Sequence, residues 1–161
     1  ILILICSFII SSAINLLTQS KSKAAAETSL PQVKLKNSAG QEKSLQQISA
    51  PSLLLFYLPQ APTCQQQLEI LNQAKTETPQ LKIITIAIGD IKKEKIMTLR
   101  KKHDTQFTWL IDKKAELTEQ LKITTIPTLV VYHPHKKIKF KEGLCKLNEL
   151  NNIIKQELEL N

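Results

Sequence analysis

Two strongly apolar segments, residues 53–57 (LLLFY) and 81–88 (LKIITIAI), most constrain the fold of this chain. A segment that is apolar throughout, instead of alternating with polar residues, is typical of a strand buried on both faces of a sheet. Between them, Leu68, Leu71 and Ala74 recur at helical spacing. Pro62 fits the first position of this helix, where its missing N–H costs no hydrogen bond. The pattern predicts a buried strand, a helix and a second buried strand.

The remainder of residues 31–161 adds shorter elements around this unit. We predict, in order, a hairpin turning at residues 38–40, a helical turn at 45–48, a lysine-rich helix at 91–103, an extended segment at 107–111, a short helix at 114–121, a hairpin of 129–132 with 137–141, and a last helix at 146–159. Buried strands separated by helices form an α/β sheet covered on both faces. We therefore expect one domain, residues 31–161, built on a central mixed sheet.

The N-terminal segment differs in composition from this domain. Residues 1–17 carry no charge and are almost wholly apolar, and residues 18–30 are small and polar. An apolar run of this kind is typical of a membrane-anchoring helix or of the apolar region of a secretory signal. Ala24–Ala26 before Glu27 fits a cleavage site. We expect residues 1–17 to anchor the chain or to be removed near Ala26, with residues 18–30 as a tether.

Charge and cysteine content exclude several classes of function. The formal net charge is +8, but Arg100 is the only arginine and no basic stripe is interleaved with aromatic residues, so we expect no binding of nucleic acid. Three cysteines without metal-ligand spacing indicate neither a disulfide scaffold nor a zinc site. His133 and His135 flank Pro134 in a predicted turn, where a metal would need further ligands. We expect no metal and no cofactor.

Four segments, in order, carry a resemblance to a known family. They are residues 31–48 (PQVKLKNSAGQEKSLQQI), 53–71 (LLLFYLPQAPTCQQQLEIL), 125–128 (TIPT) and 142–143 (EG). Together they resemble the thioredoxin superfamily, specifically the TlpA/ResA-like branch of exported thiol–disulfide oxidoreductases. The resemblance implies a thioredoxin-like fold. It also implies a place at the bacterial inner membrane facing the periplasm, or in the periplasm after cleavage.

The chain departs from this family at the active-site motif. Members carry two cysteines, C-x-x-C, at the start of the helix; the first attacks a partner disulfide as a thiolate and the second resolves the mixed disulfide. The corresponding tetrad here is Ala61-Pro62-Thr63-Cys64, so only the second cysteine is present. The resemblance therefore implies a degenerate site that does not cycle unaided, and it leaves enzymatic activity undecided.

Four interpretations of Cys64 stay open. Cys64 is a buried remnant that packs as a small apolar residue, or a monothiol that forms mixed disulfides with a partner. A third interpretation is a peroxidatic cysteine, because peroxiredoxins share this fold and carry Pro-x-x-x-Thr-x-x-Cys. Pro59 and Thr63 match that motif, but position 66 is glutamine. In the fourth, Cys64 pairs with Cys145, which the resemblance places near the rim of the site.

Pro127 matches the family's cis-proline. The resemblance implies a cis bond between Ile126 and Pro127, beside Cys64, with backbone exposed to pair with an extended peptide. The alternative is a turn retained for the fold alone. The candidate partner-binding residues are Ala61, Pro62, Thr63, Ile126 and Pro127. We expect a binding module or monothiol for a protein or peptide partner, including thiol-bearing ones; the alternative is an active oxidoreductase or a thiol peroxidase.

Overall fold

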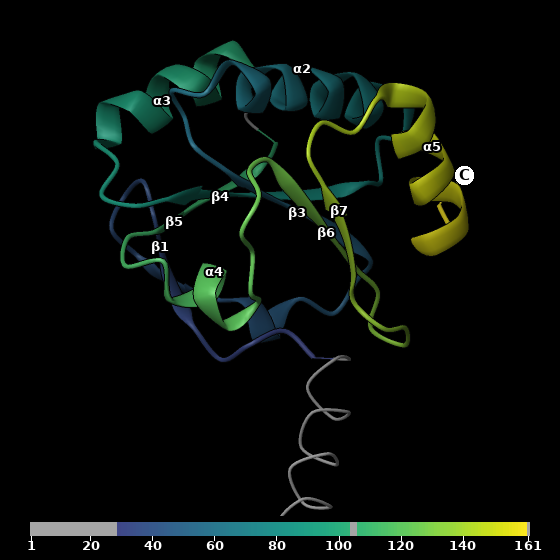
Figure 1. Ribbon diagram of the computed structural model, residues 1–161, viewed down its shortest axis with the longest axis horizontal. Helices are drawn as coiled ribbons and strands as arrows, with labels where there is room; N and C mark the ends of the chain where they lie inside the picture. The colour runs from purple at the N-terminus through teal and green to yellow at the C-terminus, as the bar shows by residue number, and fades with distance from the viewer. Residues whose placement is uncertain (1–28, 104–105, 161) are drawn as a thin grey trace, which may run out of the picture.

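A computed structural model describes residues 29–103 and 106–160, which form a seven-stranded sheet with helices on both sides (Figure 1). In chain order the elements are β1 (Lys34–Asn37), β2 (Glu42–Ser44), the 3₁₀ helix η1 (Leu45–Gln47), β3 (Ser52–Tyr57), α2 (Pro62–Glu77), β4 (Lys82–Ile88), α3 (Lys93–Lys102), β5 (Thr108–Asp112), α4 (Glu116–Gln120), β6 (Thr128–Tyr132), β7 (Lys139–Glu142) and α5 (Leu147–Glu157).

The strand order is β2-β1-β5-β4-β3-β6-β7, with β3 at an interior position. β3 pairs in parallel with β4, and β4 pairs in parallel with β5, whereas the remaining strand pairs are antiparallel. All six residues of β3 are buried. The predicted mixed sheet and its two buried strands are confirmed.

Alternate residues of β3 face two different core clusters. Leu53 and Leu55 belong to the cluster beneath α2, α3 and α5, and Leu54 and Phe56 belong to the cluster on the face that carries η1 and α4. Figure 1 shows α2 and α3 along one side of the sheet and α4 on the other. Because successive strand residues point to opposite faces, an all-apolar strand needs cover on both sides.

The predicted elements lie within a few residues of the observed ones. The predicted helix at 91–103 is α3, and the predicted last helix at 146–159 is α5. The anchor expected at residues 1–17, and the tether of residues 18–30 apart from its last two positions, lie outside the described residues. Of the helices within residues 29–103 and 106–160, none is both long and apolar enough to cross a membrane.

Candidate functional site

The loop between β3 and α2 places Cys64 in the first turn of the helix. The N–H of Ala61 donates to the carbonyl of Leu58 at 3.1 Å, and the N–H groups of Cys64 and Gln65 both donate to the carbonyl of Ala61 at 3.1 Å. Pro62 is the first helical residue, as predicted, and no side chain caps the helix. The side chain of Gln65 reaches back to the carbonyl of Pro59 at 3.1 Å, which ties the loop to the helix.

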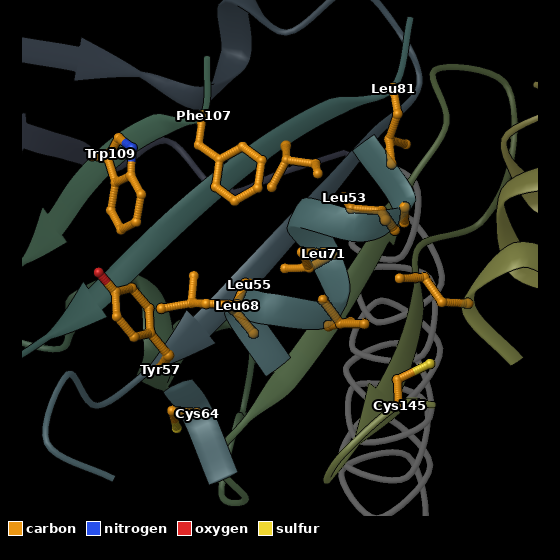
Figure 2. Close-up of a cluster of buried hydrophobic side chains, with 14 of the residues drawn as sticks. Leu53, Leu55, Tyr57, Cys64, Leu68, Leu71, Leu81, Phe107, Trp109 and Cys145 are labelled. Carbon is orange, nitrogen blue, oxygen red and sulfur yellow. The ribbon is translucent and has the colours of Figure 1, made fainter. Parts of the chain in front are cut away.

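The four residues of the tetrad differ in exposure. Pro62 and Thr63 are exposed, Ala61 is half-buried, and Cys64 has an exposed fraction of 0%. Figure 2 shows Cys64 beside Tyr57 at one end of the buried cluster, with the Phe107 and Trp109 rings further along it. Cys64 therefore faces the core, and the outer surface at the start of α2 carries no sulfur.

Burial controls the protonation of Cys64. It raises the pKa of the thiol above its ordinary value, and a backbone hydrogen bond with Leu58 only partly opposes this. A helix N-terminus by itself favours the thiolate. Removal from water disfavours the charged form. Desolvation outweighs the hydrogen bond with Leu58, so the raised pKa favours the protonated thiol of Cys64.

Two hydrogen bonds with the side chain of Gln67 connect the backbone of Cys145 to α2. The N–H of Cys145 donates to Gln67 Oε1 at 2.7 Å, and Gln67 Nε2 donates to the Cys145 carbonyl at 3.3 Å. Both residues are completely buried. The contact of Gln67 with Cys145 was not predicted from the sequence. The one feature that could have indicated it is the position of a glutamine next to Leu68, on a helix face that is otherwise apolar. Cys145 thus lies against α2, the helix that carries Cys64.

The two cysteines are separate, free thiols in the structure. Burial raises the pKa of Cys145 to about 11; the neighbouring Glu149 also raises it, and Lys141 opposes the shift. Both sulfurs belong to the same apolar cluster (Figure 2), but the disulfide considered in the sequence analysis is not formed.

The peptide bond between Ile126 and Pro127 is cis. In the β3–β6 register Phe56 stands opposite Thr128, so Pro127 lies at the end of β3 from which the loop leads to α2. The Pro127 carbonyl accepts from the N–H of Gly143 at 2.8 Å. Within the described residues, the N–H and carbonyl of Ile126 form no hydrogen bond. Ile126 is half-buried and Pro127 is buried, so the backbone of Ile126 has unused hydrogen-bonding capacity next to a buried proline.

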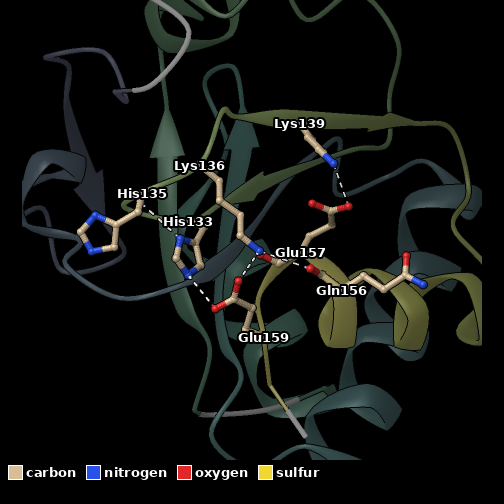
Figure 3. A network of polar contacts seen from close by, with 7 residues as sticks. All are labelled: His133, His135, Lys136, Lys139, Gln156, Glu157 and Glu159. Carbon is tan, nitrogen blue, oxygen red and sulfur yellow. Dashed lines mark hydrogen bonds and ion pairs between the residues drawn. The ribbon is translucent and has the colours of Figure 1, made fainter.

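His133 belongs to a network of ion pairs and hydrogen bonds that connects the β6–β7 turn to the end of α5 (Figure 3). Its Nε2 lies 3.9 Å from a carboxylate oxygen of Glu159, and Lys136 Nζ lies 2.6 Å from the other oxygen of the same carboxylate. Lys136 also donates to the backbone carbonyls of Gln156 and Glu157. The described ranges contain no group of three or more His, Cys, Asp or Glu side chains placed to hold a metal.

The mixed sheet with helices on both faces defines a thioredoxin-like fold. Cys64 lies in the first turn of α2, and the cis-proline lies at the end of β3 that leads to this helix. Solved structures with this fold include DsbF of Mycobacterium tuberculosis, 22% identical with a TM-score of 0.67 over 77% of this chain and 96% of that one. A secreted M. tuberculosis disulfide oxidoreductase homologous to Escherichia coli DsbE is 19% identical, with a TM-score of 0.66 over 75% and 92%. StoA of Bacillus subtilis is 20% identical, with a TM-score of 0.60 over 78% and 97%.

The chain belongs to the AhpC/TSA family, whose model matches residues 26–141. The matched region contains Cys64 and Pro127 and ends before Cys145. No curated protein sequence matches the chain.

Proposed function

We propose that this chain is an exported thioredoxin-like protein that binds an extended protein or peptide partner and does not run a thiol–disulfide cycle by itself. The observation that carries the proposal is the burial of Cys64, the only sulfur in the tetrad at the start of α2. Export is supported by the apolar composition of residues 1–17, which favours a chain facing the bacterial periplasm.

The chemistry of a cycle needs an accessible thiolate to attack and a second thiol to resolve. Position 61 offers no sulfur, and Cys64 is inaccessible with a raised pKa. With a pKa of about 11, only about one Cys145 thiol in 10,000 is ionised at pH 7. These properties favour Cys64 as a packed remnant, or as a monothiol that reacts only after the site opens.

The surface around the cysteine supports peptide binding. Ile126 presents an unpaired N–H and carbonyl, and these groups can pair with an extended peptide as a neighbouring strand would. Pro62 and Thr63 lie exposed at the start of the adjacent helix. A partner that lies along this surface would pass over Ala61, where the family has its attacking cysteine.

An active oxidoreductase with Cys145 as the second sulfur is the second candidate. The observation that favours it is the pair of hydrogen bonds between the Gln67 amide and the backbone of Cys145, because Gln67 lies about one turn after Cys64 on α2. This candidate requires both thiols to leave the core before they react.

Insulin reduction by the wild-type chain and by Ala61→Cys tests the proposal. The wild type is expected to show no turnover above that of dithiothreitol alone. Ala61→Cys restores two cysteines and is expected to reduce insulin, and to prefer it to a small disulfide such as cystine because the peptide surface contributes binding. Ala61→Ser is the matched control, because it adds one polar atom without a redox-active sulfur.

Turnover by the wild type that is lost in Cys145→Ser would refute the proposal in favour of the second candidate. Equal activity of Ala61→Cys on insulin and on cystine would count against the peptide-binding surface.

A further inference from the structure

A cavity of about 410 Å³ lies at the end of the sheet where β3, β4 and β5 begin. It is a hollow at this end of the sheet, lined by Leu45, Ile84 and Leu110 of the cluster on the η1 face and by Leu81 and Ile83 of the cluster beneath α2. The C-terminal end of α2 forms part of its wall. Lys75, the α2 residue that lines the cavity, follows Cys64 by eleven positions, so the two are about 16 Å apart along the helix axis. Figure 2 shows this separation between Leu81, beside the cavity, and Cys64.

Three lysines from three different elements line the cavity: Lys43 of β2, Lys75 of α2 and Lys82 of β4. Lys75 is held in place, since its Nζ donates to the carbonyls of Pro79 at 2.6 Å and of Leu81 at 2.7 Å. Lys43 and Lys82 form no ion pair with any residue of the ranges 29–103 and 106–160. No aspartate or glutamate of the ranges 29–103 and 106–160 lines the cavity. The positive charge around it is therefore not neutralised by the described part of the chain.

The floor of the same cavity is apolar. Leu45 and Ile48 approach from η1 and the loop after it, and Ile84 and Leu110 approach from β4 and β5. Eight of the fourteen lining residues are polar or charged, so the cavity joins an apolar floor to a polar rim. Small-molecule sites of roughly 300–1,000 Å³ likewise combine apolar surface with polar groups that fix the orientation of the ligand. An uncharged ligand would leave Lys43 and Lys82 without an ionic partner among the described residues, and a small inorganic anion would leave the apolar floor in contact with water.

We propose that this cavity binds a small amphiphilic anion of the fatty-acid class. Its acidic group lies among Lys43, Lys75 and Lys82, and its hydrocarbon body lies over Leu45, Ile48 and Ile84. The site is independent of the proposed peptide-binding surface, because the two lie at opposite ends of α2.

The test is photolabelling of the full chain with a dodecanoate that carries a diazirine in its hydrocarbon chain, followed by mass spectrometry of the labelled peptides. We expect label on residues 43–48 or 81–84 that excess dodecanoate suppresses. Lys43→Gln/Lys82→Gln is expected to reduce this label about tenfold at subsaturating probe, since an exposed charge contact contributes up to about 1 kcal/mol. Lys93→Gln/Lys101→Gln removes two exposed lysines of α3 and is expected to label as the wild type does.

A second pair of variants tests the cavity without changing any lysine. Gln47→Glu places a carboxylate at the cavity with almost no change of shape and is expected to weaken labelling, whereas Gln46→Glu adds the same charge at a neighbouring exposed position outside the cavity. Equal labelling of all these variants would overturn the proposal. So would equal labelling by the methyl ester of the probe, full protection by inorganic phosphate alone, or competitor-sensitive label confined to other segments.

Discussion

Replacing Gln67 by leucine tests whether the link between α2 and Cys145 stabilises the fold. Gln67 has an exposed fraction of 0%, and its amide makes both a 2.7 Å and a 3.3 Å hydrogen bond to the backbone of Cys145. Leucine has a similar volume but no polar atom. The Gln67→Leu variant therefore leaves the N–H and the carbonyl of Cys145 unpaired in the interior of the protein.

The expected loss of stability follows from these two groups. An unpaired buried backbone group costs about 1–3 kcal/mol, and the longer bond belongs at the lower end of this range. The leucine side chain recovers part of the loss through apolar burial, at roughly 25 cal/mol per Å². We expect Gln67→Leu to lower the free energy of unfolding by about 2–4 kcal/mol.

Urea unfolding at pH 7 measures this loss, with Gln65→Leu as the matched control. Gln65 lies on the same helix but makes a single, partly buried hydrogen bond to Pro59, so a loss of about 1 kcal/mol or less is expected. Gln67→Leu should also speed the reaction of Cys145 with a thiol reagent relative to that of Cys64. A loss below about 0.5 kcal/mol, with Cys145 as unreactive as in the wild type, would refute the reasoning.

Two further predictions concern protonation. Because burial raises the pKa of Cys64, its alkylation in the folded chain, followed by mass spectrometry, should have a half-point above the ordinary thiol value of about 8.5; a lower half-point would indicate a stabilised thiolate. The hydrogen bond and charge of Lys136 lower the pKa of Glu159, so the stabilisation by this carboxylate is present above its unfolded pKa of about 4.3 and is lost as the pH falls through the lowered folded value. Glu159→Gln should thus unfold at lower urea than the wild type at pH 7, and the difference between the two midpoints should shrink as the pH is lowered below about 4.3. A difference that does not change with pH would contradict the ion pair.

The local pattern of apolar residues was sufficient to predict the strand and the helix that flank Cys64. The apolar segment of residues 53–57 predicted β3, and Pro62 with Leu68 and Leu71 predicted the start and the inner face of α2. These signals are local, because a buried strand or helix face must be apolar whatever packs on it. The cis bond before Pro127 was implied only through the family resemblance.

Contacts between distant segments were not predictable in the same way. Gln67 and Cys145 are 78 positions apart, and no spacing rule connects them. The ion pair of Lys136 with Glu159 likewise needs the β6–β7 turn to meet the end of α5 (Figure 3). The lysines of the cavity come from three elements, and no sequence pattern connects them.

The sequence by itself determined the order of the elements and the number of sulfurs at the start of α2: one, at position 64, with alanine at position 61. The tertiary structure decided the state of that sulfur. Residues from β3, β5 and α5 pack in the same buried cluster as Cys64, so the thiol is removed from water and its pKa rises. Periodicity depends on near neighbours along the chain, whereas desolvation depends on every segment that packs around a group.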